Sequence, residues 1–327
     1  MSPFMLKKTA WICLFVILVP ALLFHLRHLR PSGGDTADTL SRVESSFYLF
    51  LHAPMVTAGH RALWLGLDRW NWTPAECVSL SSSLAGGFFF AALFRFSTSL
   101  CVWLPFLLSK SIFIFLGHVE NYAWPFALSL WAVVVLKESM GQRKGARGCF
   151  IFLGLAAVCH PITLMAWPGA IYALYPWRRR TVIVILVAII SLFGLANLLL
   201  ITLETAGHFQ GQWILPLAHG EQPLNRYTLF SSQHWWEVFV LHALNMPLGI
   251  LLLMYFGWGR WNGWQGGLIL TVCLTLAWSM VWDPTLSYDD WDLFAWPAIF
   301  VNLAGGWRWA QSRKAPHAPA GSPLDFQ

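Results

Sequence analysis

Carboxylates are concentrated in the segment Tyr288-Asp289-Asp290-Trp291-Asp292, directly before an apolar stretch near the end of the chain. Asp290 and Asp292 stand two residues apart, and closely spaced carboxylates suit a hard divalent cation that neutralises a phosphate. Trp291, between them, is a candidate for stacking on a sugar. The alternative is an acidic loop in which Asp292 occupies the first turn of a helix, where negative charge is favourable. Both interpretations stay open for Asp290 and Asp292, whereas Asp289 fits the structural one better.

A second polar group, His118-Val119-Glu120-Asn121-Tyr122, lies between two apolar stretches. Ionisable groups at membrane depth are costly and usually face a bundle interior or a wet cavity. Glu120 is therefore a candidate catalytic residue, and His118, Asn121 and Tyr122 are candidate substrate-binding residues. The alternative is a polar turn in water. On a helix, a spacing of two places His118 and Glu120 on different faces, so we expect no simple metal pair there.

Two further acids, Asp35 and Asp38, follow a turn-forming Pro-Ser-Gly-Gly segment. Apolar residues at helical spacing then predict a short surface helix over residues 36–51. A carboxylate held here could act as general base toward an acceptor hydroxyl, so both acids are candidate catalytic residues. The alternatives are that Asp35 or the next residue caps the helix, and that Asp38 pairs with Arg42 four residues on.

Arg226 is the only basic residue of the segment 204–235. An isolated arginine beside aromatic residues can clamp a lipid phosphate, so Arg226 is a candidate substrate-binding residue. An ion pair with a nearby acid is the alternative. We interpret His242 and Asn245, which lie in an apolar stretch, as packing contacts between helices.

The amino-acid composition indicates which class of protein contains these candidate residues. Of the 327 residues, 57% are hydrophobic and only 11% are charged, against about 25% charged in a soluble domain. This excludes a soluble enzyme, a disulfide scaffold, a disordered linker and a nucleic-acid module. The six cysteines contain no C-x-x-C pair. No P-loop, G-x-S-x-G or H-E-x-x-H pattern is present, which argues against ATP hydrolysis, serine hydrolysis and zinc peptidase chemistry.

A helix needs roughly 20 apolar residues to cross a membrane. The chain offers about ten such stretches, and we expect an all-α bundle of about ten spans in a single transmembrane domain, residues 1–314, followed by a disordered tail, 315–327. Two short stretches, 148–160 and 162–177, are either two spans or a re-entrant pair. The expected spans are 9–26, 77–96, 99–117, 121–137, 148–160, 162–177, 181–203, 236–257, 266–282 and 293–308.

If the N-terminus lies in the cytoplasm, basic and acidic residues fall mostly on opposite sides of the membrane. Inner segments then hold 14 of the 21 basic residues, as the positive-inside rule requires, and 13 of the 15 acids lie on or near the outer face. The long outer connections are 27–76, 204–235 and 283–292. We therefore expect an integral membrane protein with both termini in the cytoplasm.

The order of these features resembles the GT-C superfamily of membrane glycosyltransferases, in which one span precedes a long outer loop with an early acid and surface helices. Gly34-Asp35 and the segment 36–51 carry that likeness. The chain is also similar to a bacterial membrane group with a Val-Glu-Asn-Tyr motif, here 119–122, and an Asp-Trp-Asp-Leu-Phe motif, here 290–294. This second likeness spans most of the chain and is the more specific of the two.

The resemblance implies a GT-C-like fold and transfer of a sugar from a polyprenyl-phosphate donor to an envelope or lipid acceptor on the outer face. Asp35 would be the base, with Asp38 as second candidate, although the family has an adjacent acidic pair here. Glu120 or Asp292 would bind the acceptor or a metal, and Asp290 with Asp292 is the expected site for Mg²⁺ or Mn²⁺.

Two other function classes remain open. A transporter or lipid flippase would use Glu120 and His118 as a proton relay. A non-catalytic subunit of an envelope assembly complex would tolerate replacement of the candidate residues. The absence of an internal repeat, and the placing of the acids at one face, favour an enzyme with an outward-facing site.

Overall fold

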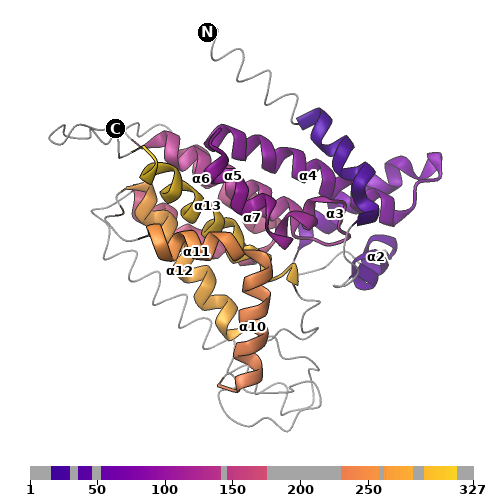
Figure 1. Ribbon diagram of the computed structural model, residues 1–327. Helices are drawn as coiled ribbons and strands as arrows, with labels where there is room; N and C mark the ends of the chain where they lie inside the picture. Colours follow the sequence, from indigo (N-terminus) through magenta and orange to yellow (C-terminus); the bar gives the residue numbers. More distant parts are fainter. Residues whose placement is uncertain are drawn as a thin grey trace, which may run out of the picture.

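The computed structural model describes residues 16–29, 36–45, 53–140, 146–174, 230–257, 261, 263–282 and 291–314. Over these residues the chain is helical and contains no strand, which confirms the all-α class (Figure 1). Nothing else of the chain is described, so the span expected at 181–203 and the tail 315–327 lie outside the structure's account.

The longest described helix is α4, Pro74–Phe96. Its start is encoded locally: the Thr73 side chain accepts from the Glu76 amide, and the Glu76 carboxylate accepts from the Thr73 amide at 2.9 Å. This capping box satisfies two amides that a helix start leaves without partners, and Pro74 suits the first helical position. Twenty-three residues extend about 35 Å, enough to cross a membrane.

Two described helices are long and apolar enough to span a membrane, α4 and α12, Trp264–Val281. A third span results if α10, Ser232–Asn245, and α11, Pro247–Phe256, are counted together, but their axes are bent by 91°. Three shorter apolar helices, Val16–Leu29, Arg147–Cys159 and Pro161–Leu174, fall where spans were expected. The described residues thus contain two or three candidate membrane spans, and the number ten is not confirmed.

Two expected spans are not continuous helices. The stretch 99–117 divides into α5, Leu100–Leu107, and the 3₁₀ helix η3, Lys110–Phe115, because the Ser109 side chain accepts from the Ser111 amide and starts a new turn. The stretch 236–257 breaks between α10 and α11 at Pro247, whose ring prevents a helix from continuing through it. Neither of these two expected spans is therefore one continuous helix.

The stretch 148–177 also breaks at a proline. It forms α7, Ala146–Cys159, then the 3₁₀ helix η5, Pro161–Ala166, and α8, Trp167–Leu174. The His160 ring accepts from the Ile162 amide at 3.3 Å and caps the new start. The helices then separate: α7 packs along α6, Ala123–Ser139, whereas α8 packs along α12.

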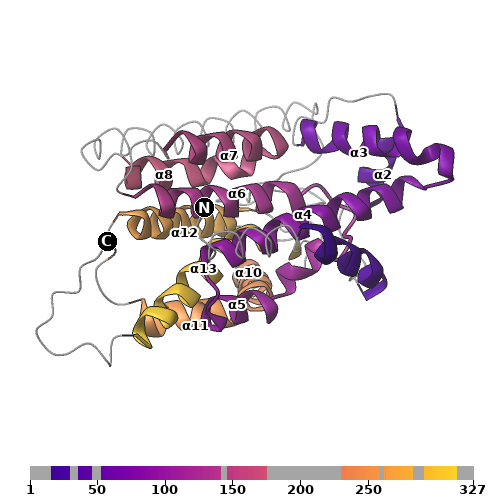
Figure 2. The ribbon, with the colours of Figure 1, turned by 90° about the horizontal axis from the view of Figure 1, so that it is seen from above.

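The helices, including α13, Ala295–Ser312, are arranged in layers. Figure 2 shows α7 and α8 on one side, α4, α6 and α12 in the middle, and α5, α11 and α13 beyond them. Trp296 and Phe300 of α13 are fully buried in this core. Where α8 crosses α12, a Cβ on Gly169 would lie 2.4 Å from the Gly267 carbonyl oxygen, so the crossing requires glycine. Small residues at crossings are typical of helices that pack in membranes.

The first long connection carries three helices: α2, Thr36–Glu44, α3, Pro54–Leu67, and the 3₁₀ helix η2, Asp68–Trp70. The expected surface helix over 36–51 is therefore shorter, ending at Glu44 with residues 46–52 outside the description. Its end is capped by Arg61, whose Nη1 donates to the carbonyls of Val43 at 2.7 Å and Glu44 at 3.0 Å. Val43 is fully buried whereas Ser41 and Glu44 are exposed, so α2 lies on the surface with one face packed against its neighbours.

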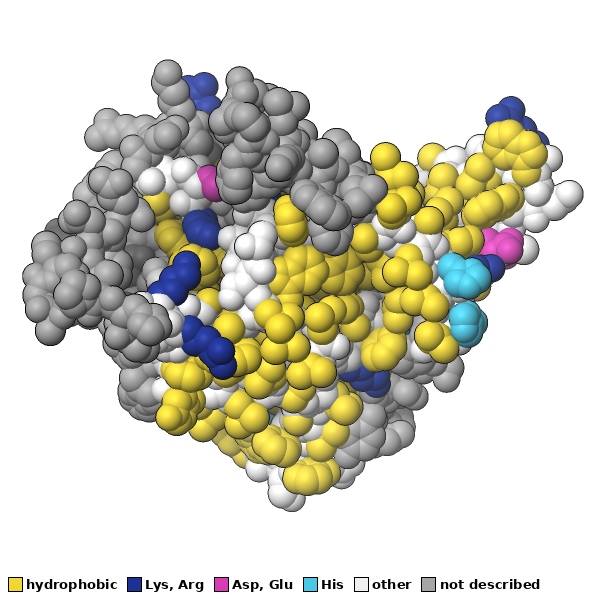
Figure 3. Space-filling model, turned by 45° about the horizontal axis from the view of Figure 1, so that its top comes forward, with side chains coloured by type: hydrophobic (Ala, Val, Ile, Leu, Met, Phe, Trp, Pro, Cys, Tyr) yellow, Lys and Arg dark blue, Asp and Glu magenta, His cyan; other side chains and the backbone are white. Residues whose placement is uncertain are grey.

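Basic and aromatic residues contact one another at the C-terminal ends of α4 and α6. Arg95 forms two hydrogen bonds to Glu138, at 2.9 and 2.8 Å. Lys137 donates to the Phe96 carbonyl at 2.7 Å, and its ammonium lies 4.3 Å from the ring centres of both Phe96 and Trp307. Figure 3 shows a broad hydrophobic surface with Lys and Arg side chains gathered at one side of it. Such an aromatic and cationic rim is typical of a membrane boundary.

Candidate functional site

Three ionisable side chains from two distant segments converge in the structure. The ligand-type atoms of His118, Glu120 and Asp292 all lie within 4.8 Å of one another. Their exposed fractions are 2%, 4% and 3%, so the cluster is buried. The His118 Nε2 and Asp292 Oδ2 atoms are 3.0 Å apart and share a hydrogen bond across 174 positions of sequence. We call these three residues the HED cluster.

A non-helical turn between η3 and α6 presents the first two members. Gly117 has a φ of +72°, and a Cβ there would lie 2.9 Å from the Arg27 Cβ, so glycine is needed. The turn is held to α4, where Ser79 donates to the Gly117 carbonyl at 2.8 Å and Ser82 to the His118 carbonyl at 2.7 Å. Because this segment is not helical, the expectation that His118 and Glu120 point to different sides is wrong.

Asp292 lies in the turn that precedes α13 and uses both carboxylate oxygens. Its Oδ1 accepts from the Leu293 amide at 2.8 Å, while Oδ2 faces His118. The backbone beside it is anchored by Asn245, whose side-chain amide donates to the Trp291 carbonyl at 2.7 Å. The two carboxylate oxygens of Asp292 therefore have different partners, a backbone amide and the His118 ring.

Trp291 is fully buried beside the cluster rather than open to a sugar. Its ring centre lies 5.1 Å from that of His118, and the Lys110 ammonium lies 4.9 Å from the Trp291 ring. The indole Nε1 donates no hydrogen bond within the described part of the chain. Lys110 thus packs against the residue that precedes Asp292 in the sequence.

The connection of residues 27–76 also reaches the cluster. The Thr39 hydroxyl of α2 donates to Glu120 Oε2 at 3.3 Å, and Thr39 itself is 3% exposed. Asp38 precedes Thr39 on the same helix, but its side chain is not described. Asp35, one residue before α2, lies outside the described residues. The helix α2, which contains Asp38 and begins one residue after Asp35, therefore contacts the cluster.

Of the remaining candidate site residues, the structure describes Asn121 and Tyr122 but not Arg226 and Asp290. Asn121 is 6% exposed, and its Oδ1 accepts no hydrogen bond from any described group. The Tyr122 ring packs against His160, with 5.2 Å between the ring centres. Arg226 and Asp290 fall outside the described residues, so the expected Asp290–Asp292 pair is not tested.

Three residues that contact the HED cluster or its neighbours are not candidates from the sequence: Thr39, Lys110 and Asn245. Lys110 lies within an expected span, and the sequence favours a packing role for Asn245. A usable signal did exist for Asn245, since it stands just before Pro247, where a helix ends and exposes polar backbone groups. Nothing in the pattern around Thr39 marks it.

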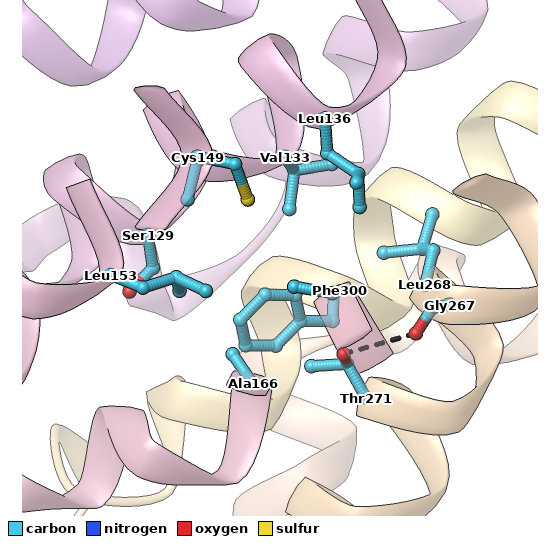
Figure 4. A pocket seen from close by; sticks show the side chains of 12 residues that line it. Ser129, Val133, Leu136, Cys149, Leu153, Ala166, Gly267, Leu268, Thr271 and Phe300 are labelled. Carbon is cyan, nitrogen blue, oxygen red and sulfur yellow. Dashed lines mark hydrogen bonds between the residues drawn. The ribbon is translucent and has the colours of Figure 1, made fainter. Parts of the chain in front are cut away.

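A small cavity lies away from the cluster, among α6, α7, α8, α12 and α13. Figure 4 shows its lining, in which Leu268 and Phe300 face Val133 and Cys149. Its volume is about 20 Å³, room for one water but not for a sugar or a lipid phosphate. None of its lining residues belongs to the HED cluster, so we assign it no substrate.

The cluster's charge constrains its chemistry. Two carboxylates with one imidazole at less than 5% exposure are costly unless a proton or a cation balances them. The group can therefore hold a proton, a cation or a polar substrate. No protein-family model, curated protein or solved structure matches this chain.

Proposed function

We propose that this chain is an integral membrane glycosyltransferase of the GT-C type, which moves a sugar from a polyprenyl-phosphate donor to an envelope or lipid acceptor. One observation supports it most: the buried HED cluster, to which the connections before α6 and before α13 contribute side chains and the first outer loop contributes Thr39. Buried ionisable groups in an apolar bundle mark functional sites by default.

The proposed reaction is direct displacement at the anomeric carbon. A carboxylate takes the proton of the acceptor hydroxyl while that oxygen bonds to the sugar carbon. The bond from carbon to the phosphate oxygen breaks, and its electron pair leaves with the polyprenyl phosphate. Asp35 is the proposed base, with Asp38 as second candidate, and Glu120 or Asp292 binds the acceptor or a metal.

The departing phosphate needs positive charge nearby. Lys110 lies against Trp291 at the edge of the cluster. Arg226 remains the second candidate for this role. The apolar surfaces between helices would hold the prenyl chain.

The finer architecture belongs to the same proposal. It comprises about ten spans, both termini in the cytoplasm of a bacterial cell, and the HED cluster on the outer side of the inner membrane. The rim around Lys137, on the opposite end of α6, supports this orientation because basic residues favour the cytoplasmic side.

A proton-coupled transporter is the second candidate. The break of 91° between α10 and α11 favours it, since transporters place broken helices at their substrate sites. The buried His118–Asp292 hydrogen bond would then act as a proton relay.

The test is transfer by the purified chain from radiolabelled polyprenyl-phosphate sugars. We expect Glu120→Gln and Asp292→Asn each to lower the transfer rate at least 100-fold. Glu138→Gln, an acid at the basic rim, is the matched control and should keep the wild-type rate. Undiminished transfer in both cluster variants would contradict the assignment.

The other function classes give different results. Transfer from no donor, together with proton-driven uptake into vesicles that Glu120→Gln abolishes, would favour the transporter. Growth unaffected by both cluster substitutions would favour a non-catalytic subunit of an assembly complex.

A further inference from the structure

We infer that the HED cluster is a binding site for one divalent transition-metal ion, of the Mn²⁺ or Zn²⁺ class, with one ligand each from His118, Glu120 and Asp292. The three ligand atoms lie within 4.8 Å of one another. Ligands around one tetrahedral ion stand about 3.4 Å apart, from metal–ligand distances of about 2.1 Å. The His118 and Asp292 atoms are already 3.0 Å apart, so only a small approach by Glu120 is needed.

The donor set points to the kind of metal. Mg²⁺ and Ca²⁺ prefer oxygen ligands alone, whereas an imidazole with two carboxylates suits Mn²⁺, Fe²⁺, Co²⁺ or Zn²⁺. This differs from the expected Asp290–Asp292 pair, because it retains Asp292 but takes its partners from the turn before α6. Three protein ligands also leave at least one position open for water or substrate.

Two buried polar groups beside the ligands lack partners. The Asn121 Oδ1 atom, next in sequence to Glu120, accepts no hydrogen bond, and the Trp291 Nε1 atom, next to Asp292, donates none among the described residues. Asn121 is 6% exposed and Trp291 fully buried, so unmet hydrogen bonds are costly at both. A water on the metal can donate to an amide oxygen and accept from an indole N–H.

Charge supports the same conclusion. A divalent cation would balance the two carboxylates, which share the cluster with one imidazole. The inference rests on the proposed function only for what the ion does there, namely to neutralise a donor phosphate. Binding itself is measured without any sugar donor, so the two proposals can fail separately.

The experiment uses the full chain, purified in detergent and stripped with a chelator. Mn²⁺ is added and the free ion is followed by electron paramagnetic resonance. We expect one Mn²⁺ per chain, at least tenfold weaker binding in Glu120→Gln and Asp292→Asn, and unchanged binding in Glu138→Gln. A tenfold excess of Mg²⁺ should not displace the bound ion.

A second variant guards against loss of binding through misfolding. His118→Cys replaces an imidazole by a thiolate, and Co²⁺ added to it should produce a sulfur-to-cobalt charge-transfer band that the wild type lacks. The inference is overturned if the wild type binds none of Mn²⁺, Co²⁺ and Zn²⁺, or if both acid variants bind Mn²⁺ as the wild type does. Metal binding without sugar transfer would overturn only the proposed function.

Discussion

At the scale of single residues, the Asp292 side chain both holds the local backbone and takes part in the candidate site. One carboxylate oxygen accepts from the Leu293 amide and the other faces His118. The neighbouring Trp291 carbonyl is held by Asn245, so the position of Asp292 depends on a residue at the end of α10. Asn245 is thus a positioning residue for the site.

We expect Asn245→Ala to lower the free energy of unfolding by about 1–3 kcal/mol, because the buried Trp291 carbonyl loses its donor. The transfer rate should fall by more than this instability explains, since Asp292 is no longer held. Thermal unfolding in detergent and the transfer assay measure the two effects. Ser232→Ala, at an exposed position on the same helix, should change stability by less than about 0.5 kcal/mol. Equal effects of the two substitutions would contradict the assignment.

His60 on α3 predicts a dependence on pH. Its side chain is 1% exposed, and burial lowers its pKa from 6.5 to about 4. The unfolded chain takes up the proton first, so this contribution to stability is complete above pH 6.5 and declines as the pH falls to 4. The total loss is about 3 kcal/mol.

Thermal unfolding between pH 7 and pH 4 measures the His60 effect. His60→Leu cannot titrate, and its melting temperature should fall less over this range than that of the wild type. Parallel curves for the two proteins would show that His60 carries no such dependence.

At the scale of elements, close crossings decide which helices pack together. Where α8 meets α12, a Cβ on Gly169 would lie 2.1 Å from the Thr271 hydroxyl and 2.4 Å from a backbone oxygen. The backbones can approach only because no side chain separates them, which is how helices gain contact without a hydrophobic driving force in lipid.

Gly169→Ala should therefore separate α8 from α12 and destabilise the protein by about 1–3 kcal/mol through overpacking. Gly154→Ala in α7 is the matched control, because a Cβ there meets nothing within 4 Å. The control should be neutral or slightly stabilising, since alanine favours helices over glycine. Melting temperatures in detergent test the pair, and a similar loss in both would rule out crossing geometry as the cause.

The sequence predicted α4, α6, α12 and α13 within a few residues, because each is a continuous apolar stretch. It failed where an apolar stretch contains a break, at Ser109 and at Pro247. Apolar composition predicts that a segment is buried away from water. It does not predict whether the backbone stays helical along the whole segment.

At the scale of the whole molecule, the two ends of the bundle differ in character. The HED cluster adjoins the start of α6, and the rim around Lys137 lies at its end, about 21 Å away along the helix axis. If α6 crosses the membrane, these ends face opposite compartments.

Cysteines placed at the two ends test this arrangement. Arg69→Cys, at an exposed position in η2, should react with a membrane-impermeant maleimide in intact cells. Lys314→Cys, exposed beyond α13, should react only after the membrane is opened. The wild-type protein gives the background from its own cysteines. Labelling of both variants from the same side would contradict the proposed topology.

Sequence alone determined the class of this protein and its candidate residues: a helical, apolar chain in which few ionisable groups remain. These are local properties, since burial in a membrane and helix formation are read from neighbouring residues. Only the tertiary structure decided that His118 meets Asp292 across 174 positions and that Glu120 joins them. That meeting depends on a turn at Gly117, held by α4, and on Asn245, and contacts between distant segments leave no periodic trace in the chain.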